Sequence, residues 1–371
     1  MEVAKFFELC NQYPWAYVAI IFDLGVVFMN GWTDVPNCIA TCVTTRCMKP
    51  KWAILMAALG NLLGTLAAGF LASVLPLGDV SSTVASIVQF ETLSVSLNQV
   101  FIAIAFGLLA NVILSLICTY FGFPSSQSNA LVGGLTGSAI GLAAISGSAN
   151  WFEAVSLNSW IKVLIGFFGS IIVGFALGYG IVWLIVLICR KLTRGATSRF
   201  FKRGQVVASA LMSLAHGLQD GAKFLGVFMV IVVMLKVGNP SAGYTSADFA
   251  SLQGMWWIVL PVAIVIFGGT LMGGKSIIKT MGSGMAKLHK YQGFATDIAA
   301  GVGLIAATVF GLPISSGTIK ATAILGVGAQ RNPRRVRWGK AGQMVLSWIA
   351  IFPGTAIIGF GLTALFAAIF K

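Results

Sequence analysis

Two short segments rich in hydroxyl side chains interrupt long apolar stretches, and they follow Pro124 and Pro313, two prolines 189 residues apart. A proline suits the first turn of a helix, and the helix that follows begins with free backbone N–H groups. Hydroxyls beside such N–H groups are suited to bind an oxyanion with several acceptor oxygens, such as phosphate or sulfate. The hydroxyl-bearing residues are Ser125, Ser126 and Ser128 in the first segment and Ser315, Ser316 and Thr318 in the second. Small residues at tight helix contacts are the alternative explanation.

Four of the ten acidic residues lie inside apolar segments: Asp23, Asp34, Asp220 and Asp297. An ionisable group in an apolar segment of membrane length is costly, so a functional role is the default interpretation. Asp34 and Asp220 occupy matching positions, each three residues after a glycine and at a predicted helix break. A broken helix exposes carbonyl oxygens that, with a carboxylate, bind a small hard cation such as Na⁺, or the carboxylate itself takes up H⁺. Helix capping or pairing with a lysine is the structural alternative, and Asp23 is the weakest candidate because its matching position carries no acid.

Other polar side chains accompany these carboxylates. Neutral oxygens next to them come from Thr33, Asn37 and Gln219, for which packing on a helix seam is the alternative. Lys223 follows Asp220 by three residues, a spacing that allows an ion pair as readily as a substrate contact. Lys320 follows the second hydroxyl segment, where its charge would compensate an anion or reach a membrane surface. His216 is a candidate proton relay, although a packed and hydrogen-bonded histidine is the more usual role.

The composition is that of a multi-pass membrane protein. The chain has 371 residues, of which 57% are hydrophobic and only 9% are charged, and its mean hydropathy is +0.92. Soluble proteins carry about 25% charged residues. The net charge of +14 therefore belongs to cytoplasmic loops rather than to a surface that binds nucleic acid.

Apolar segments long enough to cross a bilayer recur along the whole chain. We predict spans near 15–45, 52–75, 99–121 and 160–189 in the first half and near 205–236, 255–273, 294–310 and 342–371 in the second. The first span should be broken within 30–37, where Gly31 loosens the helix and Pro36 removes a backbone hydrogen bond. The two hydroxyl segments should form hairpins, the first of them over 122–148.

The distribution of basic residues predicts how these spans are oriented. Basic loops occur at 46–51, 190–203, 275–290 and 331–340, and the positive-inside rule puts all four in the cytoplasm. This requires each hairpin to carry the chain across the membrane, which gives each half five crossings and opposite orientations. We therefore predict an all-α fold of two inverted repeats, with broken helices and paired helical hairpins at the midplane. The repeats are 1–190 and 205–371, joined by a basic cytoplasmic linker at 191–204.

The ordered motifs resemble those of the inorganic phosphate transporter (PiT) family of cation-coupled symporters, over nearly the whole chain. The matching stretches are Gly31-Trp-Thr-Asp-Val-Pro-Asn37, Gln205, His216-Gly-Leu-Gln-Asp-Gly-Ala-Lys-Phe-Leu-Gly226, Thr280-Met-Gly282, Gly293-Phe-Ala-Thr-Asp297, Pro124-Ser-Ser-Gln-Ser-Asn129 and Pro313-Ile-Ser-Ser-Gly-Thr318. Each match alone is weak, but their common order in both repeats is specific.

The resemblance implies a role for each matching residue. Phosphate would be bound by Ser126, Gln127, Ser128, Ser315, Ser316, Gly317 and Thr318. The coupling cation would be bound by Asp34, Asn37, Asp220 and Asp297, with Thr33 and Gln219 in place of the asparagine that precedes each aspartate in the family. Asn129 and Thr318 replace both signature histidines, and Gln127 and Gly317 replace threonines, so the number of ligands at both sites differs from the family pattern.

The sequence thus predicts a secondary transporter of inorganic phosphate in the plasma membrane of a prokaryotic cell, coupled to Na⁺ or H⁺ and working by alternating access. It predicts no cofactor and no nucleic-acid partner, and it leaves a homodimer open. A permease for sulfate or another oxyanion and an anion channel are the alternatives. A membrane enzyme is disfavoured because the chain has only two histidines and no evident nucleophile–base pair.

Overall fold

The computed structural model describes residues 2–70, 80–121, 125–240, 252, 254–273, 278 and 285–369. Pro124 and the Thr280-Met-Gly282 motif lie outside these residues. The described chain is helical apart from turns and one isolated bridge between Val88 and Val155. Eight of the described helical segments are long and apolar enough to cross a membrane. The predicted all-α, multi-pass fold is therefore confirmed.

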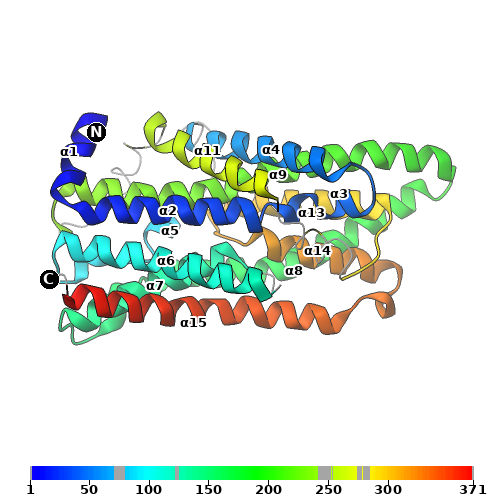
Figure 1. Ribbon diagram of the computed structural model, residues 1–371. Coiled ribbons are helices and arrows are strands. Elements are labelled where there is room, and N and C mark those ends of the chain that lie inside the picture. The colour runs from blue at the N-terminus through cyan, green and yellow to red at the C-terminus, as the bar shows by residue number, and fades with distance from the viewer. Residues whose placement is uncertain are drawn as a thin grey trace.

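The helices of both halves run along one elongated bundle (Figure 1). The first half contains α1 (Val3–Gln12), α2 (Pro14–Thr33), α3 (Pro36–Thr44), α4 (Pro50–Phe70), α5 (Val80–Ala85), α6 (Leu97–Phe121), α7 (Gln127–Ile145) and α8 (Leu157–Cys189). The second half contains α9 (Arg194–Val237), α11 (Trp256–Met272), α13 (Lys290–Val309), α14 (Ser316–Arg331) and α15 (Trp338–Ile369).

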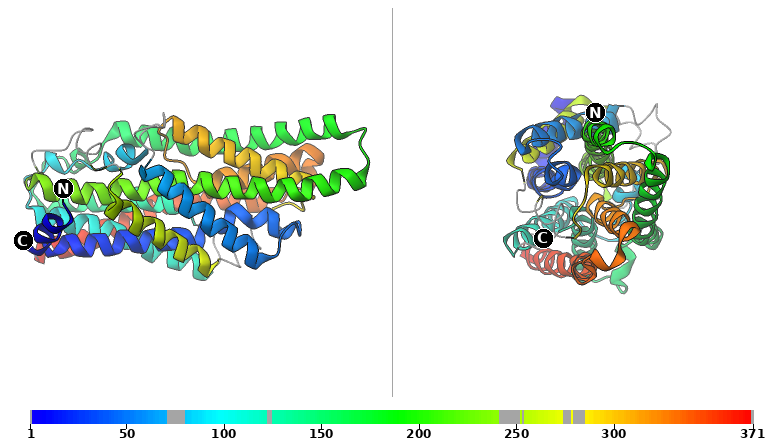
Figure 2. Two further views of the ribbon diagram at one scale, coloured as in Figure 1. Left: turned by 90° about the horizontal axis from the view of Figure 1, so that it is seen from above. Right: turned by 90° about the vertical axis from the view of Figure 1, so that its right-hand side faces the viewer.

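Basic connections gather at one end of the elongated bundle. Figure 1 shows the α3–α4, α8–α9 and α14–α15 connections at the end opposite both termini. Figure 2 shows that the joined ends of α8 and α9 extend beyond the other helices there. We call this the basic end. Its position agrees with the positive-inside prediction for these loops.

Each hydroxyl segment forms the turn between two antiparallel helices. The first hairpin consists of α6 and α7, and the second of α13 and α14. Within the stretch predicted as a hairpin at 122–148, Gln127–Ile145 form a single helix, and α6 is its partner. The first hairpin opens towards the termini and the second towards the basic end, so their turns point towards each other inside the molecule (Figure 1).

Helices of one half pack mainly against helices of the other half, and these contacts come in corresponding pairs. Helix α2 packs against α11, as α9 packs against α4. Helix α7 packs against α15, as α14 packs against α8. Each half therefore completes the packing of the other, while the inverted orientation of the halves and their division at 190 and 205 stay predictions.

Only one of the two predicted helix breaks is present. Helix α2 ends at Thr33, and Pro36 starts α3 because its ring cannot continue the hydrogen-bond ladder. Helix α9 instead runs without interruption through Asp220, so the second break was a wrong prediction. No proline lies within α9, and a glycine alone lowers helix stability by only about 1 kcal/mol. Helix α9 also begins at Arg194, so most of the predicted linker at 191–204 is helical.

Gly31 and Gly217 serve close helix packing. A Cβ atom on Gly31 would lie 2.5 Å from the Ile266 carbonyl oxygen of α11, and one on Gly217 would lie 2.4 Å from the Asn61 carbonyl oxygen of α4. Both glycines thus let the helices that carry Asp34 and Asp220 approach a neighbouring backbone. The two glycines that suggested breaks mark helix crossings, and Pro36 accounts for the one break that is present.

Replacing Gly31 by alanine should therefore lower the melting temperature of the purified protein. The added methyl group would push α2 and α11 apart, and overpacking of this kind costs about 1–3 kcal/mol. Gly169→Ala on α8 is the matched control, because a Cβ atom there meets no atom within 4 Å. Equal melting temperatures of the two variants would contradict the close packing at Gly31.

Candidate functional site

The two hairpin turns meet at one lysine of α9. Lys223 Nζ donates to Ser128 Oγ at 2.7 Å on the first hairpin and to the Ile314 carbonyl oxygen at 2.5 Å on the second. Its third partner is Asp220 Oδ1, at 2.6 Å. Lys223 and Asp220 are fully enclosed by protein. A single buried ammonium group therefore holds together both segments predicted to bind an anion.

Asp220 has partners on both carboxylate oxygens. Asn30 Nδ2 of α2 donates to Asp220 Oδ2 at 2.8 Å, and His216 Nε2 lies 3.2 Å from the same oxygen. The other ring nitrogen of His216 is hydrogen-bonded to Asn61 Oδ1 of α4 at 2.7 Å. Asp220 thus balances the charge of Lys223 and fixes its direction, which is the ion pair that the spacing of the two residues allowed.

Asp34 faces the start of α7. The backbone N–H of Gln127 donates to Asp34 Oδ2 at 3.3 Å, and Gln127 Nε2 donates to Thr33 Oγ1 at 3.0 Å. The first-turn N–H groups of a helix favour a negative charge at this position. Asp34 Oδ1 has no hydrogen-bond partner among the residues that the structure describes. This carboxylate is buried and, within the same residues, makes no ion pair with a lysine or arginine.

The hydroxyls at the two helix starts divide into two groups. Ser126 and Ser315 are N-caps, and each accepts a hydrogen bond of 3.3 Å from the backbone N–H three residues later. This is the local capping role of serine at a helix start. Ser316 Oγ and Thr318 Oγ1 are buried at the start of α14 and make no hydrogen bond within the described chain. They remain available to a ligand.

Asn37 brings α3 against the start of α14. A Cβ atom on Gly317 would lie 3.1 Å from Asn37 Nδ2, so the absence of a side chain at Gly317 lets the amide approach. The amide oxygen of Asn37 is buried without a hydrogen-bond partner in the described ranges. Asp34 and Asn37 of the broken helix thus flank the two hairpin turns.

These atoms form what we call the polar centre. Its buried oxygens without a protein partner in the described part of the chain are Asn30 Oδ1, Asp34 Oδ1, Asn37 Oδ1, Ser316 Oγ and Thr318 Oγ1. A buried polar atom without a hydrogen bond costs about 1–3 kcal/mol, so native proteins rarely leave several of them together. Carboxylate and amide oxygens suit a hard cation, and hydroxyls beside helix N–H groups suit an oxyanion.

The side chain of Gln219 does not contribute to the polar centre beside Asp220. Its side-chain amide donates to the Leu312 carbonyl oxygen at 2.8 Å, and its amide oxygen accepts a hydrogen bond from the Thr308 hydroxyl. Gln219 therefore anchors the turn of the second hairpin to α9. Its predicted role in cation binding would require both bonds to change.

Two further predicted carboxylates lie elsewhere. Asp297 pairs with Lys320 in a separate buried cluster. Asp23 is fully buried on α2, and neither of its carboxyl oxygens has a hydrogen-bond partner within the described residues. The four intramembrane carboxylates thus occupy three different environments.

The sequence analysis missed several residues that support this site. Ser115 Oγ donates to Gln127 Oε1 at 3.1 Å, and Asn111 Nδ2 donates to the Gln127 carbonyl oxygen at 3.4 Å. Asn30 binds Asp220 from the other half of the chain. The signal that could have found them is simple, since each is an isolated polar residue in an apolar span.

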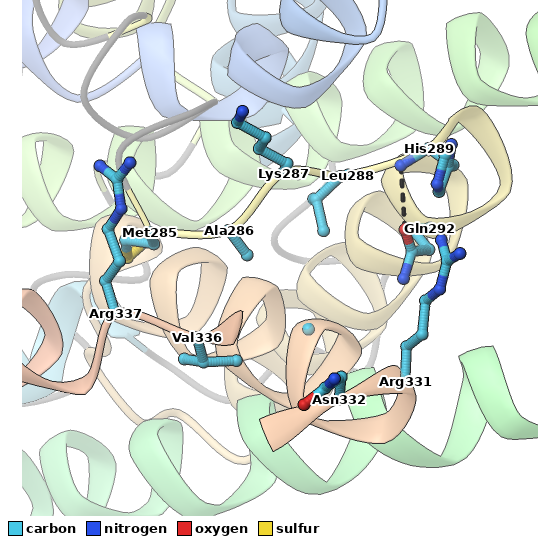
Figure 3. A pocket seen from close by; sticks show the side chains of 11 residues that line it. Met285, Ala286, Lys287, Leu288, His289, Gln292, Arg331, Asn332, Val336 and Arg337 are labelled. Atoms are coloured by element: carbon cyan, nitrogen blue, oxygen red, sulfur yellow. Dashed lines mark hydrogen bonds between the residues drawn. The ribbon is translucent and has the colours of Figure 1, made fainter. Parts of the chain in front are cut away.

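A positively charged pocket lies at the basic end (Figure 3). The cavity has a volume of about 500 Å³, and its charged walls include Lys287, Arg331 and Arg337. Burial and the neighbouring Arg331 guanidinium lower the pKa of His289, so this histidine adds no charge near neutral pH. Arg331 is the last residue of α14, whose first turn belongs to the polar centre. Such a pocket attracts anions to this end of the molecule.

A helical membrane bundle with a buried polar centre at helix starts is the architecture of a secondary transporter. The family model described as "Phosphate transporter family" matches residues 30–359. The chain therefore belongs to the phosphate transporter family.

Relatives in this family match nearly end to end. A probable low-affinity inorganic phosphate transporter of Bacillus subtilis (strain 168) is 31% identical over 92% of this chain and 93% of its own length. A protein of Rhizobium meliloti (strain 1021) with the same description is 33% identical over 92% of both chains. A solved structure described as the sodium-dependent phosphate transporter has a TM-score of 0.80 and 21% identity, and the match covers 96% of this chain and 100% of that one. This last match supports the fold.

Proposed function

We propose that this protein carries inorganic phosphate across the plasma membrane together with a cation, Na⁺ or H⁺, by alternating access. The observation that carries the proposal is the set of unpartnered oxygens in the polar centre, which combines cation ligands with anion ligands. Phosphate would bind where the two hairpin turns meet, through the Ser316 and Thr318 hydroxyls and the helix-start N–H groups of α7 and α14. Lys223 would shift from its present partners towards the anion.

The coupling cation would bind at Asp34. The ammonium of Lys223 already balances Asp220, whereas Asp34 has no such partner among the described residues. A cation held by Asp34 Oδ1 and Asn37 Oδ1 would offset the charge of the incoming anion. Each ligand would then favour the conformation that the other binds, which is the thermodynamic basis of coupling.

The donor set favours Na⁺ over H⁺. Amide and hydroxyl oxygens add ligands for a metal ion, while they offer little to a proton beyond the carboxylate itself. Protonation of Asp34 or Asp23 is the alternative. The relative described as sodium-dependent has the same fold, which supports the choice.

Uptake into proteoliposomes tests this function directly. Labelled phosphate should accumulate against its gradient when Na⁺ is higher outside at equal pH, and protein-free liposomes should show none. Accumulation driven only by a pH gradient would assign the coupling to protons. If sulfate competes with phosphate and phosphate does not accumulate, the result would favour a sulfate permease. The altered signature residues Asn129 and Thr318 leave this alternative open. Rapid flux without uphill accumulation would indicate an anion channel.

A further inference from the structure

A second buried charge cluster lies apart from Lys223, between α3, α9, α13 and α14. The ammonium of Lys320 donates to Asp297 Oδ1 and, at 3.2 Å, to Thr41 Oγ1, and it lies 3.4 Å from Met212 Sδ. Thr41 Oγ1 and Ser209 Oγ donate to the two carboxylate oxygens of Asp297, both at 2.6 Å. Lys320 and Asp297 have no exposed surface.

The groups around the ammonium are those of a site for a hard cation. They comprise one carboxylate and one hydroxyl in direct contact, with a second hydroxyl bound to the far carboxylate oxygen. Oxygen donors of this kind bind ions such as Na⁺ when several helices bring them together. Here the cation is supplied by the chain itself, from the second turn of α14.

The matching positions in the other half of the chain hold no such pair. The positions 189 residues before Asp297 and Lys320 are Leu108 on α6 and Leu131 on α7. Both leucines are buried in the same apolar cluster. Because α6 and α7 form the corresponding hairpin with leucines, the ion pair is not needed to join the two helices of a hairpin. Buried ion pairs also seldom stabilise more than apolar residues of similar volume.

We propose that Lys320 is a resident cation, whose ammonium fills a cation site built from Asp297, Thr41 and Ser209. Asp297 therefore binds no exchangeable Na⁺ in this protein, and the coupling ion is left to the Asp34 region. The inference rests on the proposed cation-coupled function for its role in transport, but the occupancy of the site can be measured without transport. Lys320 and Asp297 belong to one hairpin, so the charge stays neutralised if that hairpin moves relative to α3 and α9.

Binding of ²²Na⁺ to the purified full-length protein in detergent, at pH 8 with choline replacing sodium, tests the proposal. Lys320→Ala should bind one more Na⁺ per molecule than the wild type, because the vacated space exposes the Asp297 carboxylate. The double variant Lys320→Ala, Asp297→Asn should return to the wild-type number. An equal number of bound Na⁺ in the wild type and in a folded Lys320→Ala variant would overturn the proposal.

A second variant covers the case in which Lys320→Ala does not fold. Asp297→Asn alone should bind the same number of Na⁺ as the wild type, since the wild-type carboxylate already holds the ammonium. Loss of one Na⁺ in Asp297→Asn would show that Asp297 binds the exchangeable ion and would overturn the proposal equally. A wild type that fails to transport phosphate would disprove the proposed function and leave these binding counts unaffected.

Discussion

Replacing Lys223 by methionine should abolish phosphate uptake and destabilise the folded protein. The change keeps an unbranched side chain one atom shorter but leaves Asp220 buried without its cation. Breaking a buried ion pair in this way costs about 3–5 kcal/mol. It also removes the donor shared by Ser128 and the Ile314 carbonyl, so the two hairpin turns lose their common contact. Uptake into proteoliposomes and the melting temperature of the purified protein measure the two effects.

The double variant Lys223→Met, Asp220→Asn separates charge balance from transport. Removing both charges should restore most of the melting temperature, because no uncompensated charge stays buried. Uptake should remain absent, because the ammonium that faces the hairpin turns is still missing. Phosphate uptake close to the wild-type rate in either variant would contradict the role of Lys223 at the junction of the hairpins.

Replacing Asp34 by asparagine should reduce cation-driven phosphate uptake to background while the protein stays folded. Asparagine still accepts the hydrogen bond from the Gln127 N–H, so the stability should change by only about 1 kcal/mol. The lost charge removes the main ligand proposed for the coupling cation. Uptake at a series of Na⁺ concentrations and the melting temperature in the same buffers provide the measurement.

Asp23→Asn is the matched control, since it makes the same substitution at a second buried aspartate, which lies within α2. With Na⁺ coupling at Asp34, this control should retain uptake. Loss of uptake in Asp23→Asn together with normal uptake in Asp34→Asn would move the coupling site to Asp23 and would favour protons. The pair of variants therefore decides between Asp34 and Asp23, two buried carboxylates for which the described residues provide no ion pair.

Local signals in the sequence were enough to predict much of the fold. The apolar spans, the helix break at Pro36 and the two hydroxyl segments between helices depend on residues within a few positions of one another. Proline acts on its own backbone and on the preceding turn, so its effect can be inferred without knowing the tertiary contacts. The spans were therefore placed correctly, whereas the helix after Pro313 begins at Ser316 and the stretch 122–148 contains only one helix.

Contacts between distant parts of the chain could not be inferred in this way. Gly217 was interpreted as a helix break, whereas it packs against the backbone of Asn61, more than 150 residues away in sequence. A glycine supports a break or a close contact equally well until the neighbouring helix is known. Gln219 was placed beside the cation for the same reason, although its partners lie on the second hairpin.

The roles of the hydroxyl and charged groups needed atomic geometry. Serines in the two turns have the same residue type and similar positions, yet Ser126 and Ser315 cap helices and Ser316 does not. The interaction of Asp297 with Lys320 depends on how α13 returns into α14, and Thr41 comes from the other half of the chain. Sequence spacing limits which groups are available, while the fold decides which of them meet.

The Asp297–Lys320 ion pair of the second hairpin also affects which conformation the ligand-free protein prefers. If its halves exchange conformations to open first to one side of the membrane and then to the other, two identical halves would make both states equal in energy. One hairpin contains Asp297 and Lys320, whereas the other contains Leu108 and Leu131. Because the two halves differ in this way, the two states differ in energy. The ligand-free molecule then has a preferred facing direction set by its own sequence, before any ion gradient or membrane voltage acts on it.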